Sequence, residues 1–454
     1  MSDEIAKSAA SVENFGYRQE LRRTLTVWDL IVYGMVFMVP IAPFAVFGFV
    51  FRDAKGMVPL AYLVGLTGMF FTAMSYASMS RAFPLAGSVY SYVGRGLHEV
   101  AGFFAGWLIL LDYILVPSLL YLVSAVALRP LFPVVPDWIW LLSFVTFNAA
   151  VNFVGVRLSA RVNLCILALE IATLALFVSA GLVALHRGQG AGSLTLKPVY
   201  DPAVFSMATI VGATSIAVLS FLGFDGISTL AEESRGGQGT VARATVAALL
   251  LVGVLFILQT WIAADLAQGM RFSSPETAFY EVAERAGGTA LRTVVIGVNS
   301  LASGIANALA AQAAVSRILY AMARDGKLPA VLARVHPRFR TPYVSTLMVA
   351  GISVAVGLLF ANHLDDLTRI VNFGALTGFL LLHMAVINHY VIRGGSRAWI
   401  PHLGMPLAGF TVIAYVLYEM DSAAKIMGGV WIAAGMVYFA VLTFLLKKPV
   451  KIDM

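Results

Sequence analysis

Residues 34–43 read Gly-Met-Val-Phe-Met-Val-Pro-Ile-Ala-Pro and interrupt an apolar run that extends from residue 27 to residue 50. Pro40 and Pro43 have no backbone N–H, so a helix over this run loses hydrogen bonds near its middle. Backbone groups freed by such a break are tolerated in a bilayer only where protein or water surrounds them. The stretch therefore predicts a membrane helix that is broken at an internal site.

A second interruption lies in the apolar run 207–231. Residues 220–226 read Ser-Phe-Leu-Gly-Phe-Asp-Gly, which puts two glycines and an acidic residue in the middle of the run. Paired interruptions in corresponding spans of two halves are typical of inverted-repeat transporters, whose site lies at the midplane. Ordinary kinks are the alternative, because Gly and Pro are common in membrane helices. Two breaks five spans apart favour the transporter site.

The composition also indicates a membrane protein. Hydrophobic residues make up 59% of the 454 residues and charged residues only 12%, which is too few charges to cover a soluble surface. Soluble multidomain enzymes and nucleic-acid-binding proteins are therefore excluded, despite a net charge of +7. A membrane-spanning helix needs about 20 apolar residues. Twelve runs of about that length are found, at 27–50, 57–80, 101–128, 137–155, 162–185, 207–231, 243–266, 292–323, 344–361, 367–392, 404–421 and 427–446.

The charges between these runs predict the orientation. About two thirds of the 31 lysine and arginine residues fall on the side of the N-terminus, which predicts that both termini are cytoplasmic in a plasma (inner) membrane protein. A stretch at 275–286 is too polar to span and is expected to lie along the surface. The expected segments are an N-terminal tail (1–24), spans one to five (25–187), spans six to ten (205–393), spans eleven and twelve (402–447) and a C-terminal tail (448–454).

Acidic residues inside the spans mark candidate functional positions. Each is costly in a bilayer and usually faces the protein interior. Asp112 lies in span three, Glu170 in span five and Asp225 at the break in span six, whereas Asp265, near the outer end of span seven, is expected to be solvated. The sequence has no phosphate-binding loop, no His/Cys metal spacing and no nucleophile elbow. It therefore predicts no enzymatic activity, no cofactor and no metal.

Several stretches carry a resemblance to a known family. The sequence resembles the amino acid–polyamine–organocation (APC) transporters over residues 20–446, and within them most resembles bacterial putrescine importers. The matching stretches are Phe-Pro-Leu-Ala-Gly-Ser-Val-Tyr-Ser-Tyr (83–92), Leu-Leu-Asp-Tyr (110–113), Ser-Phe-Leu-Gly-Phe-Asp through Glu-Glu (220–233), Val-Ser-Arg-Ile-Leu-Tyr-Ala-Met-Ala-Arg-Asp (315–325), His-Pro-Arg-Phe-Arg-Thr-Pro (336–342) and Ile-Val-Asn-Phe-Gly-Ala-Leu (370–376).

The resemblance implies an all-α, LeuT-like fold of two inverted five-helix repeats, with two peripheral helices completing twelve. Substrate is then expected between the breaks of spans one and six, walled by spans three, eight and ten. An aromatic lid is expected from Phe221 or Phe224. The substrate-lining residues implied are Val39, Pro40, Ile41 and Ala42 in span one, Tyr113 in span three, and Ser220, Phe221, Leu222, Phe224 and Asp225 in span six.

Two departures from the family pattern bear on the substrate. Many amino acid transporters of the family have a glycine-rich break in span one whose N–H groups bind the substrate carboxylate, but here prolines remove donors. Some proton-coupled members have a lysine in span five, where this sequence has Glu170. A site poor in carboxylate donors and rich in acids favours a cation, because a buried ammonium needs a counter-charge. Asp225 is the expected main ammonium partner, and Asp112 or Glu170 the second partner or proton site.

The sequence thus predicts a secondary transporter that imports putrescine or a similar small amine, coupled to protons, with sodium left open. An amino acid permease or exchanger of the same fold is the nearest alternative, and a membrane amine sensor without accumulation is an alternative from another class. The expected partners are the amine or amino acid, the coupling ion and the lipid bilayer, with no nucleic acid. A monomer and a dimer both remain open.

Overall fold

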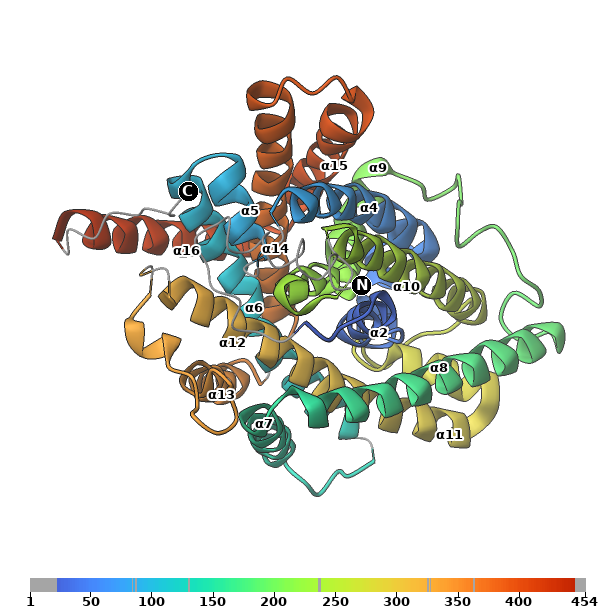
Figure 1. The fold of residues 1–454 in the computed structure, drawn as a ribbon. Helices are drawn as coiled ribbons and strands as arrows, with labels where there is room; N and C mark the ends of the chain where they lie inside the picture. The colour runs from blue at the N-terminus through green and yellow to red at the C-terminus, as the bar shows by residue number, and fades with distance from the viewer. Residues whose placement is uncertain are drawn as a thin grey trace.

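The computed structural model describes residues 23–445, apart from residues 84, 86–87, 130, 236–237, 325, 327 and 362–363. The terminal tails expected at 1–24 and 448–454 therefore lie almost wholly outside the described residues. Within the described chain the regular elements are helices, with one isolated β-bridge between Leu25 and Ser234. Figure 1 shows these helices gathered in one bundle.

The α-helices are α2 (Val27–Met38), α3 (Pro43–Asp53), α4 (Val58–Ala82), α5 (Ser88–Gly96), α6 (Glu99–Leu128), α7 (Asp137–Val154), α8 (Val156–His186), α9 (Met207–Ala217), α10 (Gln238–Leu266), α11 (Ala278–Leu301), α12 (Ala308–Arg324), α13 (Tyr343–Leu359), α14 (Leu364–Val386), α15 (Met405–Glu419) and α16 (Ser422–Ala440). Short 3-10 segments are η1 (Val218–Phe221), η2 (Phe224–Glu233) and η4 (Ala330–Ala333). Short π-helical segments are η3 (Ala302–Asn307), η5 (Ile387–Arg393), η6 (Ile400–Gly404) and η7 (Val441–Leu445).

Among the described residues, ten helices are long and apolar enough to cross a membrane, or eleven if the bent pair α2–α3 counts as one span. Each of the twelve apolar runs in the sequence coincides with one of these elements or with α13. Helix α13 is a shorter apolar helix of 17 residues. The chain is thus an all-helical, multi-pass protein, and the count of twelve spans stays a prediction.

The break in span one separates α2 from α3 by a bend of 54°. Val39 has a φ of 53°, a left-handed conformation that interrupts the helix, and Pro43 is the first residue of α3. The amide of Ala42 donates to the carbonyl of Val39 at 2.8 Å, which closes a turn between the two helices. The carbonyl of Pro40 accepts a 2.8 Å hydrogen bond from the side chain of Gln259 on α10. The freed backbone is therefore satisfied inside the protein, as a break in a bilayer requires.

The break in span six divides it into α9, η1 and η2. Gly223, between η1 and η2, has a φ of 113°, which a residue with a side chain rarely adopts. A Cβ at Gly223 would lie 3.0 Å from Phe37 on α2, and one at Gly226 would lie 2.2 Å from the same ring. The glycines therefore allow η2 to approach α2 closely, and the two broken spans pack directly against each other.

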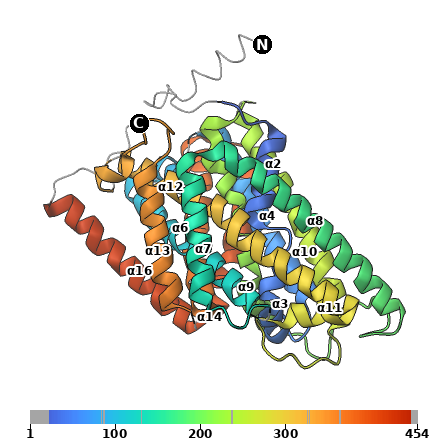
Figure 2. The same cartoon turned by 90° about the horizontal axis from the view of Figure 1, so that it is seen from below.

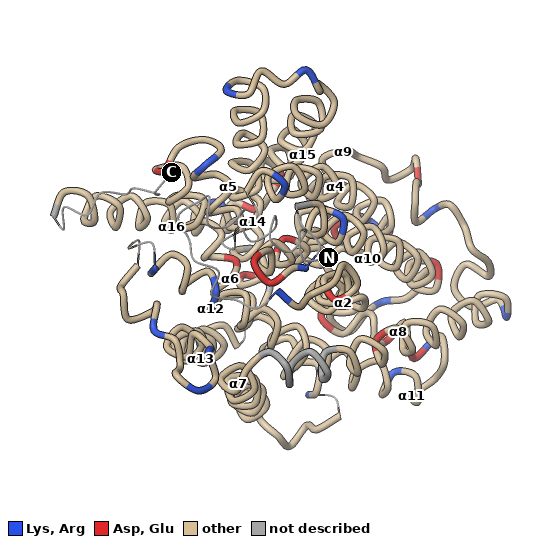
Figure 3. The backbone as a smooth tube through the Cα atoms, in the orientation of Figure 1, with Lys and Arg blue, Asp and Glu red and all other residues tan. Residues whose placement is uncertain are grey.

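The bundle has a packed centre and two peripheral helices. Helix α4 packs along α10, and α6 packs along α14. In the most apolar part of Met207–Glu233, 72% of residues are buried, against 22% for Ile400–Glu419 and 17% for Ser422–Phe444. Figure 2 shows α16 running along one edge of the bundle. Figure 3 shows charged residues mainly at helix ends and in loops, with some acidic segments near the centre between α6 and α2.

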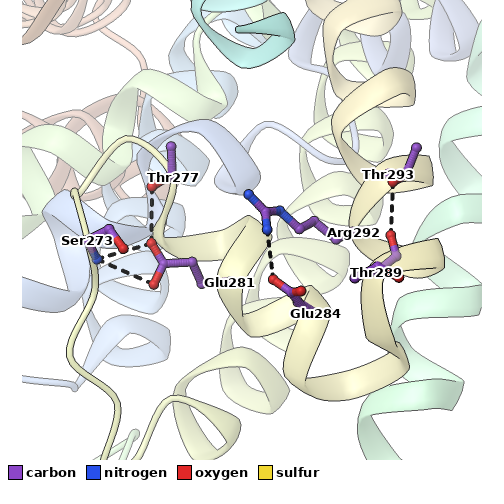
Figure 4. A network of polar contacts seen from close by, with 7 residues as sticks. All are labelled: Ser273, Thr277, Glu281, Glu284, Thr289, Arg292 and Thr293. Carbon is purple, nitrogen blue, oxygen red and sulfur yellow. Dashed lines mark hydrogen bonds and ion pairs between the residues drawn. The ribbon is translucent and has the colours of Figure 1, made fainter. Parts of the chain in front are cut away.

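The polar stretch expected along the surface at 275–286 forms the first part of α11. One side of it is buried, because the ring of Phe279 stacks on Phe44 of α3 at 3.9 Å. The helix then bends at Gly287 and Gly288, and an ion pair of 2.8 Å between Glu284 and Arg292 spans the bend. Figure 4 shows this pair beside a second group, in which Glu281 accepts from Ser273 and Thr277. The segment packs against α3, the second half of span one, from the side.

The expectation that Asp265 is solvated is wrong. Its side chain is buried at the end of α10. The backbone N–H and the hydroxyl of Thr195 donate to its two oxygens at 2.8 and 2.6 Å, and Gln268 donates at 3.2 Å. Asp265 therefore fastens the loop after α8 to the end of α10.

Candidate functional site

A cavity of about 80 Å³ lies where the two broken spans meet. Since one water needs roughly 10–15 Å³, the space is large enough for a small organic molecule of several atoms. Its walls come from α2, α3, α6, η1, η2, η3, α12 and α14. The lining continues along α3 and the second half of α6, away from the end at which α2 begins. Seven sequence-predicted site residues line it: Val39, Ala42, Asp112, Tyr113, Ser220, Leu222 and Asp225.

Asp225 is held in a defined position within this cavity. It is the second residue of η2 and is 1% exposed. The hydroxyl of Tyr113 on α6 donates a hydrogen bond to its Oδ2, and the backbone N–H of Gly223 donates to its Oδ1 at 3.3 Å. Because a carboxylate has about four acceptor positions, Asp225 keeps capacity for a further donor while its orientation is fixed.

Asp112 precedes Tyr113 on α6 and is 4% exposed. Its Oδ1 has no hydrogen-bond partner in the described structure. Helix α14 packs closely behind it, since a Cβ at Gly374 would lie 3.0 Å from the Asp112 backbone nitrogen and 2.7 Å from the carbonyl oxygen of Leu108. Gly374 therefore lets α14 approach the backbone of α6 at the level of Asp112.

Five predicted residues do not line the cavity: Pro40, Ile41, Glu170, Phe221 and Phe224. The ring of Phe221 packs between Tyr62 and Phe256, at 5.9 and 5.1 Å between ring centroids. Phe224 packs against Tyr76 and Phe379, both at 5.7 Å. Both rings are fully buried in neighbouring helices, so neither covers the cavity as the expected aromatic lid.

Pro40 and Ile41 lie in the turn between α2 and α3, where the carbonyl of Pro40 faces Gln259. Glu170 is fully buried on α8, and neither of its carboxylate oxygens has a partner in the described structure. Leu167, one turn earlier on α8, packs against Val36 of α2 and Ala306 of η3. Residues three apart share a helix face, so Glu170 lies on the side of α8 that faces those two elements.

The lining also includes polar residues that the sequence reasoning did not name. Ser303 and Asn307 belong to η3, and Thr368 belongs to α14. The Oδ1 of Asn307 is buried without a partner. π-Helical segments such as η3 are frequent at functional sites. The recurrence of Asn299, Ser303 and Asn307 at intervals of four in an apolar span is the signal that would have found this face.

Several polar contacts join the elements that lie between the cavity and the end at which α2 begins. Arg317 of α12 lies 3.3 Å from Glu233 of η2, with both side chains mostly buried. The backbone amides of Thr24 and Leu25 donate to the carbonyl of Glu233 at 2.9 and 3.0 Å, and the amide of Arg235 donates to Leu25 at 2.8 Å. The chain ahead of α2 is thus fastened to the end of span six.

Titratable ligands for a metal are not clustered in the described structure. No group of three or more His, Cys, Asp or Glu side chains could hold an ion among the residues described. The acidic residues of the cavity are the pair Asp112 and Asp225 alone, and no lysine, arginine or histidine is found among the described residues that line it. The arrangement can accept hydrogen bonds from a cation in an otherwise largely apolar space.

Known proteins match this chain over most of its length. Residues 26–446 match the family model described as amino acid permease. The low-affinity putrescine importer PlaP of Escherichia coli K12 is 31% identical over 95% of this chain and 96% of its own. The branched-chain amino acid permease BcaP of Bacillus subtilis is 27% identical over 81% of each chain. The methylthioribose transporter of the same organism is 27% identical over 93% of this chain and 94% of its own.

The extent of these matches decides the class of protein. The family model covers nearly all of the described chain, and the putrescine importer is matched almost end to end. The relatives are permeases and transporters, not enzymes. The chain belongs to the amino acid permease family of the APC superfamily and is a multi-pass membrane transporter.

Proposed function

We propose that this protein imports a small organic amine, putrescine or a close analogue, across the plasma (inner) membrane by proton-coupled alternating access. Asp225 is the main partner of the ammonium group. The protein would use a LeuT-like arrangement of two inverted five-helix repeats, with both termini in the cytoplasm. Asp112 and Glu170 are the candidates for a second ammonium partner or for the proton.

The observation that carries the proposal is the charge of the cavity. Asp112 and Asp225 contribute two carboxylates, and the described lining contains no basic side chain. A carboxylate taken out of water needs a positive or hydrogen-bonding partner, and breaking a buried ion pair typically costs 3–5 kcal/mol. An amine that enters the cavity supplies this partner, whereas a substrate with its own carboxylate adds repulsion.

The break in span one supports the same substrate class. A carboxylate of an amino acid needs free backbone N–H groups near this break, but Pro40 and Pro43 have none. The N–H of Ala42 already donates to Val39 at 2.8 Å. At the break in span six, the N–H of Gly223 donates to Asp225. Donors for an α-carboxylate are therefore scarce at both breaks.

An amino acid permease is the second candidate function. The family description and the relative named as a branched-chain amino acid permease favour it. It predicts that the backbone N–H of Ile41, or a group that lines the cavity, still supplies a donor to the substrate carboxylate. A sensor that does not accumulate its ligand is the third, and accumulation against a gradient separates it from a transporter.

The test is uptake of radiolabelled putrescine into proteoliposomes under an inward proton gradient, with diamines, agmatine and amino acids as competitors. We expect diamines to block uptake and neutral amino acids to leave it unchanged. Asp225→Asn should abolish uptake, whereas Asp201→Asn, a matched change in an exposed loop, should not. Amino acid exchange without putrescine uptake would establish the permease instead. Wild-type rates in Asp225→Asn would refute the site.

A further inference from the structure

Three of the buried carboxylates in the spans, those of Asp112, Glu170 and Asp225, differ in the hydrogen bonds that they can still accept. Asp225 accepts hydrogen bonds at both oxygens, from Tyr113 and from Gly223. Glu170 has two free oxygens but does not line the cavity. Asp112 alone of the three both lines the cavity and has an oxygen without a partner in the described structure. Of these three carboxylates, that of Asp112 is therefore the one that still requires a donor from inside the cavity.

The hydroxyl groups around the cavity are largely committed elsewhere. Tyr113 donates to Asp225, and Thr368 donates to the carbonyl of Leu364 at 2.9 Å. Ser220 shares a hydrogen bond of 2.9 Å with Tyr62. A buried carboxylate oxygen without a donor is costly, and no described basic side chain lines the cavity to supply one. Ser303 and Asn307 also line the cavity, but the Oδ1 of Asp112 accepts a hydrogen bond from neither in the described structure. The missing donor is therefore expected to come from the ligand.

An ammonium group fits this requirement. It carries three donors and no acceptor, so one ammonium can bind Asp225 and a second can bind Asp112. The wall beside Asp112 is apolar, with Val116 and Leu119 following it on α6 and Leu222 at the break in span six. A methylene chain between two ammonium groups would contact such a wall.

We infer that Asp112 is a specificity-determining residue that recognises the second ammonium group of an aliphatic diamine. This inference rests on the proposed function, because it assumes that Asp225 binds the first ammonium. It assigns the two carboxylates different tasks. Asp225 is needed for any amine, whereas Asp112 distinguishes a diamine from a monoamine of the same length.

The test compares putrescine with n-butylamine, which has the same four-carbon chain and one ammonium. Inhibition constants for both are measured by displacement of radiolabelled putrescine from purified protein in detergent. For wild type we expect putrescine to bind about 10- to 100-fold more tightly than n-butylamine, the range of a charge-assisted hydrogen bond. In Asp112→Asn this ratio should fall to within about threefold of unity, with n-butylamine little changed.

Two further variants serve as controls. Asp112→Glu keeps the charge and should retain most of the wild-type ratio. Asp201→Asn, a matched loss of charge outside the cavity, should leave both constants unchanged. If Asp112→Asn cannot be purified, Asp112→Ser, which also removes the charge, takes its place in the same comparison. Equal binding of the two amines by wild type would overturn the inference without any variant.

The outcomes separate the two proposals. If wild-type protein binds neither amine, the proposed function fails, and the inference fails with it. If wild type binds amines but Asp112→Asn keeps the full preference for putrescine, the proposed function stands and the role of Asp112 is refuted. If Asp112→Asn lost affinity equally for both amines, Asp112 would stabilise the structure of the cavity and would not bind the second ammonium group.

Discussion

The hydroxyl of Tyr113 donates a hydrogen bond to the carboxylate of Asp225, which joins α6 to the break in span six. Both residues are buried, and both line the cavity. The bond fixes the carboxylate relative to α6 before a ligand arrives. Preorganised acceptors lower the cost of ordering on binding.

Tyr113→Phe should therefore weaken amine binding with little effect on folding. A hydrogen bond to a charged group is worth about 1.5–3 kcal/mol, so we expect the inhibition constant for putrescine to rise about 10- to 100-fold. Tyr280→Phe is the matched control, because Tyr280 is also buried and accepts a hydrogen bond from Asn299 away from the cavity. Unchanged affinity in Tyr113→Phe would show that the bond does not organise the site.

Gln259→Leu tests how the break in span one is stabilised. The variant removes the donor to the Pro40 carbonyl, and a buried acceptor left without a partner costs about 1–3 kcal/mol. We expect a lower melting temperature in detergent, by several degrees, and reduced putrescine uptake. Gln189→Leu, in an exposed loop, should change neither. Normal stability in Gln259→Leu would mean that another group satisfies the carbonyl.

Glu170→Gln tests the proton site. Glu170 is buried without hydrogen-bond partners, outside the cavity, on the side of α8 that faces α2 and η3. If it carries the coupled proton, the neutral variant should lose accumulation driven by a proton gradient but retain exchange of labelled for unlabelled putrescine. The two assays on one proteoliposome preparation provide the check. Proton-driven accumulation at the wild-type level would assign the proton elsewhere.

The breaks in spans one and six could be predicted because proline and glycine act on the backbone of their own segment. The structure has both breaks at the expected places, and their contact follows from Gly223 and Gly226. The directions of Phe221 and Phe224 could not be predicted, because a 3-10 segment does not keep the 3.6-residue repeat on which a face assignment depends. The binding roles of the residues that do line the cavity remain proposals.

Contacts between residues that are distant in the sequence could not be predicted either. The buried carboxylate of Asp265 accepts two hydrogen bonds from Thr195, which lies 70 positions earlier in the chain. The sequence around Asp265 contains no pattern that predicts this contact with Thr195. Gln259 and Asn307 were missed for the same reason. Gln259 matters because it contacts the break in span one, and Asn307 because it lines the cavity, and neither contact is visible in the local sequence. Acidic residues inside the spans were easier to find. Each is costly in a bilayer, so it can be recognised as a candidate without knowledge of its partner.

The ion pair between Glu233 and Arg317 leads to the last prediction. The pair joins η2 to α12 on the side of the cavity where α2 begins, with a distance of 3.3 Å between the charged groups. Three backbone hydrogen bonds on the same side connect Thr24 and Leu25 to residues 233–235. The proposed alternating access requires this side to open. We therefore expect the pair to stabilise the closed arrangement, and Glu233→Gln to favour the open one.

Cysteine labelling measures this shift. The native Cys165 is exposed, so it is first replaced by serine, and Ile31, a buried residue of α2, is replaced by cysteine. A partly buried ion pair worth about 1 kcal/mol changes an opening equilibrium about fivefold. Glu233→Gln should raise the rate of maleimide labelling at position 31 by that factor. Exchanging the charges, with Glu233→Arg and Arg317→Glu together, should return it toward the parent rate. Equal rates in all three proteins would show that the backbone bridge alone keeps this side closed.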